Sequence, residues 1–152
     1  MQEIQDKIID HVLVHLINND DEGILADACW VLAYISERSD ERTQEVFDAG
    51  VVPRLVAILD HNEDAVIEGA LFAISTIYSV ENPDWITPVI NARAIPRLML
   101  LLDSPHAVVA VKAAYTVVNI GTEEPEIRDQ LIEQGLIKKM LDIIKPNISC
   151  IT

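Results

Sequence analysis

The chain has 152 residues, half of them hydrophobic, and its 25 acidic against 11 basic side chains give a net charge of −14. This is the length of one ordinary domain, and the scarcity of glycine and aromatic residues favours helices over a sandwich or barrel. Because phosphate groups must be met by Lys and Arg, we expect no nucleic-acid partner and favour a basic protein partner. No apolar run approaches the ~18 residues of a membrane span, so no membrane partner is expected.

The first predicted helix contains the sequence HVLVHLINN, residues 11–19. Its two histidines, His11 and His15, are four residues apart, a spacing that suits two metal ligands on a helix. The apolar residues of the segment recur on the other face, and neither a third ligand nor the glutamate of a zinc-protease pattern is evident. We therefore expect two solvated histidines and no metal site. The two cysteines, Cys29 and Cys150, form no metal-binding pair either.

The next predicted helix spans residues 23–36, GILADACWVLAYIS. It is apolar on nearly all sides, as expected for a helix that is sandwiched between neighbours. Trp30 and Tyr34 are four residues apart, so they share one face of this helix. Similar long helices are predicted over residues 65–79 and 106–121.

Two shorter helices are predicted between successive long ones. The segment 40–50, DERTQEVFDAG, is followed by a helix with Pro53 in its first turn, where the missing N–H does little harm. Gly50 falls where the chain stops and turns, a position that often needs positive φ. Gly135 has the equivalent place in the last unit. Arg93 has it in the middle unit, so the turn there must differ or be strained.

The chain repeats itself at a fixed interval. VPRLVAILD and IPRLMLLLD align without a gap 43 residues apart, and HVLVHLINN and KKMLDIIKP are further versions of the same element. Helical units with a period in the low forties are typical of armadillo or HEAT arrays. We predict one all-α solenoid domain, 1–152, with two complete three-helix repeats and a partial repeat at each end. The incomplete ends look uncapped, which leaves self-association through them open. The predicted units are approximately 1–38, 39–80, 81–122 and 123–152.

One position of the aligned long helices is always aromatic. The aligned residues are Trp30, Phe72 and Tyr115, and four residues later stand Tyr34, Thr76 and Asn119. In one interpretation the rings fill space between helices, the commoner use of aromatic residues at helical spacing. In the other they line a concave face and hold the aliphatic stems and cationic heads of Lys or Arg, while a side-chain amide clamps the peptide backbone. Trp85, in a predicted short helix, has no aromatic counterpart.

The sequences LADACWVLAYIS, TQEVFDAGVVPRLVAILDH and AAYTVVNI resemble the central armadillo repeats of the importin-alpha family. The similarity extends from about Ile9 to Ile144. It implies a right-handed superhelix whose concave groove binds lysine-rich nuclear localisation signals through a tryptophan and asparagine array, with acidic residues gripping the cations. It also implies a protein of the cytoplasm and nucleus. The basic importin-beta-binding segment of the family has no counterpart in this sequence, so we do not expect a complete import adaptor.

The resemblance assigns individual positions. Trp30 matches a ladder tryptophan of the groove, and Asn119 matches a ladder asparagine that here follows a tyrosine. Phe72 and Thr76 stand where the family usually has an arginine and an asparagine, so a positive charge and a main-chain clamp are expected to be lost from the groove floor. The predicted peptide-binding residues are Asp27, Trp30, Tyr34, Glu37, Glu68, Phe72, Thr76, Tyr115 and Asn119.

No phosphate-binding glycine loop, nucleophile elbow or paired nucleophile and base occurs in the sequence, so we expect neither an enzyme nor a cofactor. The favoured function is recognition of basic extended peptides, such as nuclear localisation signals, by an importin-alpha-like import adaptor or a truncated relative. The alternative is a general armadillo scaffold for protein–protein interaction without a cargo role.

Overall fold

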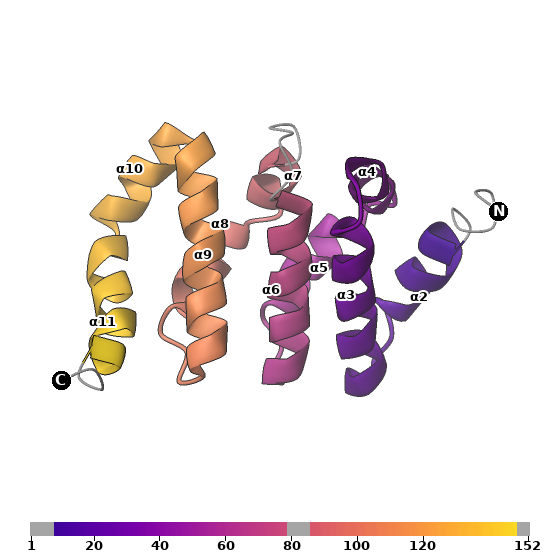
Figure 1. Cartoon of the computed structure of the whole chain (residues 1–152), viewed down its shortest axis with the longest axis horizontal. Coiled ribbons are helices and arrows are strands. Elements are labelled where there is room, and N and C mark those ends of the chain that lie inside the picture. Colours follow the sequence, from indigo (N-terminus) through magenta and orange to yellow (C-terminus); the bar gives the residue numbers. More distant parts are fainter. Residues whose placement is uncertain (1–7, 79–85, 149–152) are drawn as a thin grey trace.

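A computed structural model describes residues 8–78 and 86–148 of the chain. Helices follow one another as an array that runs across Figure 1 from the N-terminal end to the C-terminal end. The array begins with a short π-helix, η1 (Ile8–Leu13), which continues into α2 (Val14–Leu16). His11 and His15 are both exposed on this first element, as the sequence predicts. Trp85 falls outside the described residues.

Three long helices stand side by side in the middle of the array (Figure 1). The central one packs against both others and most extensively against the N-terminal one. Asp21 caps the first of them, because its carboxylate accepts a hydrogen bond from the Ile24 N–H at 3.0 Å. The observed bounds lie within two residues of the predicted ones. The long helices are α3 (Glu22–Ser36), α6 (Asp64–Tyr78) and α9 (Ala107–Glu123).

Two shorter helices accompany each junction between long ones, and together they complete the three-helix units. One set lies near one end of the long helices, and α5 and α8 of the other set lie behind the row (Figure 1). The all-α solenoid predicted from the 43-residue period is therefore confirmed. The first set is α4 (Asp40–Asp48), α7 (Ile86–Asn91) and α10 (Pro125–Glu133), and the second is α5 (Val52–Ile58), α8 (Ala94–Leu101) and α11 (Leu136–Ile148).

The turn before each helix of the second set has the same left-handed backbone. The φ angle is 71° at Gly50 and 88° at Gly135, as the sequence predicts, and 60° at Arg93. Of the two alternatives for Arg93, the structure shows the strained one. A residue with a Cβ adopts this conformation only at an energetic cost, which the flanking helices must offset.

A single apolar core runs through the units, and Cys29 is part of it. Burial of the thiol raises the Cys29 pKa to about 12, only partly offset by the charge of Arg54, so the group behaves as a small apolar side chain. Gly69 on α6 lies directly against this cysteine. A Cβ at Gly69 would come within 3.0 Å of the Cys29 Cβ, so the glycine is what lets α6 approach α3 so closely.

Successive units are also joined by a repeated polar contact. The Arg54 side chain donates to the Ile17 carbonyl at 3.0 Å, and Arg97, one repeat later, pairs with Asp60 at 2.6 Å. Lys139 pairs with Asp103 in the following unit. A basic residue in the first turns of each second-set helix thus bonds the end of the corresponding helix in the preceding unit.

No helix in the described part of the chain is both long and apolar enough to cross a membrane. Nor do the described residues bring three or more His, Cys, Asp or Glu side chains together in a way that could hold a metal ion.

Candidate functional site

Three rings from two neighbouring long helices meet on the surface of the array, and we call Trp30, Tyr34 and Phe72 the ring cluster. The Trp30 and Tyr34 rings are stacked with centroids 6.0 Å apart, because the two residues are one turn apart on α3. The Phe72 ring on α6 lies 5.1 Å from the Trp30 ring and 6.2 Å from the Tyr34 ring. These distances are those of favourable aromatic pairs. The predicted alignment of Trp30 with Phe72 is therefore a physical contact.

The ring cluster is not sealed in the interior. Tyr34 keeps 58% of its surface exposed, while Trp30 and Phe72 are half-buried. Each half-buried ring combines packing against the neighbouring helix with a face or edge that solvent reaches. The rings therefore pack between two helices and also reach the surface, and their use in binding a ligand stays a prediction.

A lysine that sequence analysis did not single out lies over these rings. The Lys112 Nζ atom on α9 is 4.4 Å from the centroid of Phe72 and 6.0 Å from that of Trp30, within the range of a cation–π interaction. Among the described residues, Lys112 forms no ion pair. The loss of the family's arginine at Phe72 was expected to remove a positive charge from this surface, but Lys112 supplies one from the next helix.

The position of Lys112 follows from the repeat. Lys112 and Gly69 occupy the same place in α9 and α6, three residues before the aromatic position in each helix. A Cβ at Gly69 would lie 3.4 Å from the Trp30 ring on the preceding long helix. The same place in α9 accordingly directs the Lys112 side chain towards the Phe72 ring on α6. The sequence signal for Lys112 is its repeat position: aligning the long helices along their whole length, and not only at the aromatic positions, places it opposite Gly69.

The C-terminal part of the predicted ladder differs from the ring cluster. Tyr115 on α9 is 58% exposed, and none of the ring contacts among described residues includes it. Four residues later, the Asn119 backbone carbonyl accepts a hydrogen bond from the Tyr78 hydroxyl at 2.8 Å. Burial, followed by the nearby charges of Glu123 and Glu124, raises the Tyr78 pKa to about 12. The neutral hydroxyl therefore holds α6 to α9 beside Asn119.

Thr76 is the least accessible of the predicted site residues, with 7% of its surface exposed. Its hydroxyl donates to the carbonyls of Phe72 and Ala73 in its own helix, each at 3.0 Å. Thr76 therefore shapes the surface beneath the rings, and its hydroxyl is directed back to α6.

Of the three predicted acidic residues, Asp27 lies on α3, Glu37 is the C-cap of α3, and Glu68 lies on α6. Asp27 and Glu37 are exposed and Glu68 is half-buried. None of the three forms an ion pair within the described residues. Their role in attracting a basic ligand stays a prediction.

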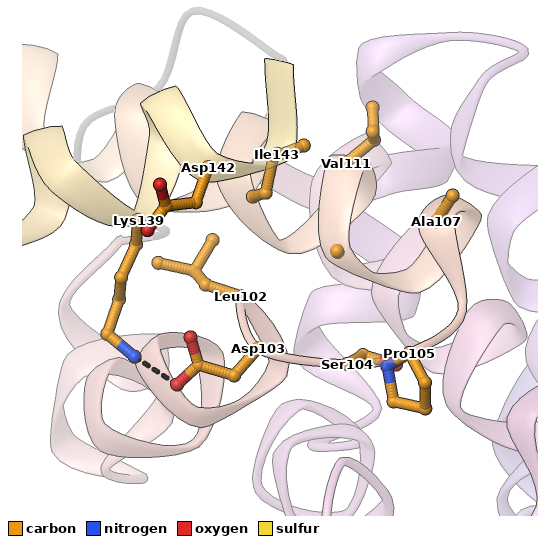
Figure 2. A pocket seen from close by; sticks show the side chains of 10 residues that line it. Leu102, Asp103, Ser104, Pro105, Ala107, Val111, Lys139, Asp142 and Ile143 are labelled. Atoms are coloured by element: carbon orange, nitrogen blue, oxygen red, sulfur yellow. Dashed lines mark hydrogen bonds and ion pairs between the residues drawn. The ribbon is translucent and has the colours of Figure 1, made fainter. Parts of the chain in front are cut away.

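A separate hollow of about 330 Å³ lies at the C-terminal end of the array, where the turn before α9 faces α11 (Figure 2). Lys139 and Asp103 form an ion pair at its edge, and Asp142 pairs with Lys145. Because these charges are already matched and the hollow is open, its polar groups do not converge on a ligand position. The ring cluster is the stronger candidate site.

Comparison with known proteins identifies the repeat. The profile of the armadillo/beta-catenin-like repeat matches residues 6–37 and 39–77. Importin subunit alpha-1a of Oryza sativa subsp. japonica is 31% identical over 131 residues, which is 86% of this chain and 25% of the rice protein. Importin subunit alpha-3 of Arabidopsis thaliana is 41% identical over 96 residues, which is 62% of this chain and 18% of the plant protein. The chain thus spans about a quarter or less of these relatives.

Solved structures of designed proteins share the architecture. A designed armadillo repeat protein in complex with the peptide (KR)4 superimposes with a TM-score of 0.77 and 30% identity, covering 87% of this chain and 55% of the other. A structure of computationally designed armadillo repeat proteins for modular peptide recognition gives a TM-score of 0.81 and 28% identity, with coverage of 94% and 60%.

Proposed function

Since this chain is an armadillo-repeat solenoid similar in sequence to importin alpha subunits, we propose that it binds basic, extended protein segments across the ring cluster. The observation that carries the proposal is Lys112, whose ammonium lies 4.4 Å from the Phe72 ring centroid. The surface already accommodates one lysine head without an acidic partner for it among the described residues. A lysine or arginine from another chain can form the same kind of cation–π contact on the exposed side of the rings.

The rings and the acids would act together on such a ligand. Tyr34 offers an exposed flat surface for the cationic head of a basic side chain, and the part of Trp30 that Lys112 does not cover offers one for its aliphatic stem. Asp27 on α3 and Glu37 at its C-terminal end are exposed and would attract those cations, and the net charge of −14 would speed their encounter with the surface. The Asn119 side-chain amide would bond the peptide backbone.

The similarity to importin alpha subunits makes nuclear localisation signals the favoured class of basic segment, and a protein that moves between cytoplasm and nucleus the favoured setting. One designed neighbour holds a peptide of alternating lysine and arginine, which supports the same ligand chemistry. Binding of such a segment requires no cofactor, and we propose no catalytic role.

The test is a titration of a fluorescent lysine-rich peptide at low and moderate salt. Wild-type protein should bind it, and the affinity should fall as salt rises. Trp30→Ala should weaken binding about tenfold or more, on the order of 1.4 kcal/mol. Because Trp30 also packs against α6, Tyr34→Ala is the companion variant: 58% of the tyrosine is exposed, so its loss should leave the fold intact.

The matched control is Leu100→Ala. Leu100 is a large apolar residue on α8 with 71% of its surface exposed, and it lies outside the ring cluster. Leu100→Ala should leave the peptide affinity unchanged. Equal affinity of wild type, Trp30→Ala and Tyr34→Ala, or no binding by wild type, would contradict the proposed function.

An observation at the other end of the array favours the alternative of a general interaction scaffold. Ile137, Leu141 and Ile144 on α11 are all about half exposed and recur at helical spacing. Such an apolar face is suited to contact with another protein. If wild type binds no peptide but self-associates in sedimentation, and Leu141→Asp abolishes that self-association, the result would favour self-association through this end of the array.

A further inference from the structure

We propose that Lys112 is a specificity-determining residue of the ring cluster: it occupies the Trp30–Phe72 cation position from within the chain and disfavours a cationic ligand side chain there. The inference rests on the proposed function and goes further, because it states which ligand side chain the central position rejects. It begins from the contact itself, with the Lys112 Nζ atom 4.4 Å from the Phe72 ring and 6.0 Å from the Trp30 ring.

The surroundings of Lys112 explain why it stays over the rings. The side chain is half-buried on a helix whose neighbouring residues are mostly apolar, in the sequence AVVAVKAAYTVV. Within the described residues no carboxylate pairs with its ammonium, so the ring faces are the favourable partners that the structure gives it. An ammonium that is partly removed from water gains more from an aromatic face than an exposed one does.

A second cation at this position would meet two disadvantages. It would compete with Lys112 for the same ring face, and it would lie close to a like charge in a partly desolvated place. An acidic or neutral ligand side chain meets neither disadvantage, and a carboxylate would be attracted to the ammonium. The exposed Tyr34 on α3 remains open to one ligand cation, and the exposed Tyr115 on α9 remains open to another. The ring cluster is therefore expected to select a segment whose basic residues flank a non-cationic one.

The experiment compares wild type with Lys112→Met and Lys138→Met. Methionine keeps the length and apolar stem of lysine while removing its charge. Lys138 lies exposed on α11, outside the ring cluster, so Lys138→Met changes the net charge by the same amount as the test variant. Each protein is titrated with a lysine-rich fluorescent peptide and with versions in which each lysine in turn is replaced by Ala or Glu.

The expected result is a change of preference at one peptide position. In wild type and Lys138→Met, Lys→Glu at that position leaves affinity equal or higher. In Lys112→Met, the all-lysine peptide binds about tenfold more tightly and the same Lys→Glu change weakens binding about tenfold, about 1.4 kcal/mol. If Lys112→Met and Lys138→Met give the same affinities across the whole peptide series, the inference is wrong while the proposed function stands.

The remaining outcomes separate the two proposals. Binding of the lysine-rich peptide by Lys112→Met alone would support the inference and contradict the proposed function of the wild-type chain. Absence of binding by all three proteins would contradict both. Circular dichroism and thermal unfolding confirm that each variant is folded, and Lys112→Gln serves as a second variant where methionine alters the fold.

A readout without peptide tests the charge position directly. Trp30 is the single tryptophan in a Trp85→Phe background, since the chain has two. A cation beside Trp30 favours quenching of its fluorescence by iodide over quenching by caesium. Lys112→Met should lower the iodide-to-caesium ratio about twofold, whereas Lys138→Met should leave it unchanged; an unchanged ratio in Lys112→Met would place the ammonium away from the rings.

Discussion

The α3–α6 junction and the α6–α9 junction join equivalent helices of consecutive units, yet different side chains hold them together. At the first, Gly69 brings α6 against Cys29, and the rings of Trp30 and Phe72 touch. At the second, the residue in the place of Gly69 is Lys112, which reaches across to Phe72. One junction is closed by the absence of a side chain and the other is bridged by a long one.

The polar contacts follow the same division. The α6–α9 junction has a hydrogen bond from the Tyr78 hydroxyl to the Asn119 carbonyl and a polar contact of 2.6 Å between His106 Nε2 and Asp64 Oδ2. At the α3–α6 junction, the contacts described above are those between aromatic rings and between Gly69 and Cys29. The comparison shows that a solenoid with a regular backbone repeat can vary the surface at each junction through one position of the long helix, because that position faces the preceding long helix.

The largest effect is expected from a methyl group added at the close junction. Gly69→Ala should lower the free energy of unfolding by about 1–3 kcal/mol, because the new Cβ would lie 3.0 Å from the Cys29 Cβ and 3.3 Å from the Ala26 carbonyl oxygen. Urea unfolding followed by circular dichroism measures it. The helix must shift to admit the methyl group, so the contact between Trp30 and Phe72 should loosen as well.

Gly121→Ala is the control for the intrinsic preference of helices for alanine. A Cβ there would be 3.4 Å from its nearest neighbour, the Cβ of Arg128, which is an ordinary contact. This variant should be neutral or stabilised by up to ~1 kcal/mol. Equal changes in the two variants would show that the α3–α6 junction is no closer than other helix contacts of the array.

The next largest change in stability is expected from substitutions in the turns that precede the second-set helices. Arg93→Gly should stabilise the protein by about 1 kcal/mol, since glycine adopts a φ of 60° without the steric conflict that arginine has there. Gly50→Ala, at a φ of 71°, should destabilise by about 1–2 kcal/mol for the same reason. A Cβ at Gly50 would meet nothing within 4 Å, so the change in unfolding free energy of Gly50→Ala reports the backbone strain alone.

Thermal and urea unfolding of Arg93→Gly and Gly50→Ala measure how much backbone strain at these turns affects stability. A stabilised Gly50→Ala, or an Arg93→Gly that is destabilised by as much as Gly50→Ala, would mean that side-chain contacts rather than backbone conformation set the stability of these turns. The pair also shows whether the third unit, which contains Arg93, tolerates more backbone strain than the second, which contains Gly50.

The fold was predictable to a large extent, because the 43-residue period, the turn glycines and the helical spacing of apolar residues all indicate the same arrangement. Trp30 and Phe72, which the repeat aligns, are also in contact. The cation over the rings was not predicted, since a lysine in an apolar helix does not reveal which neighbour it reaches. That contact depends on how far apart α6 and α9 stand, which is set by packing of whole units rather than by any local pattern. Thr76 illustrates the same limit, because the sequence does not indicate that its hydroxyl turns back to its own helix.

The smallest effect is expected at the hydroxyl that joins α6 to α9. Tyr78→Phe removes the 2.8 Å hydrogen bond to the Asn119 carbonyl and should lower the free energy of unfolding by about 0.5–1 kcal/mol at neutral pH.

Burial raises the Tyr78 pKa from 10.0 to about 12, so the native state favours the neutral phenol. The stability that this gives is fully present below pH 10 and is lost as pH rises towards 12, because the unfolded chain releases the proton first. Urea unfolding at pH 9 and pH 11 should therefore show a smaller loss of stability in Tyr78→Phe than in wild type, whereas Tyr115→Phe, which removes an exposed hydroxyl from α9, should follow wild type. Identical pH dependence in all three proteins would mean that the second junction is held by Lys112 and the apolar contacts without help from this hydroxyl.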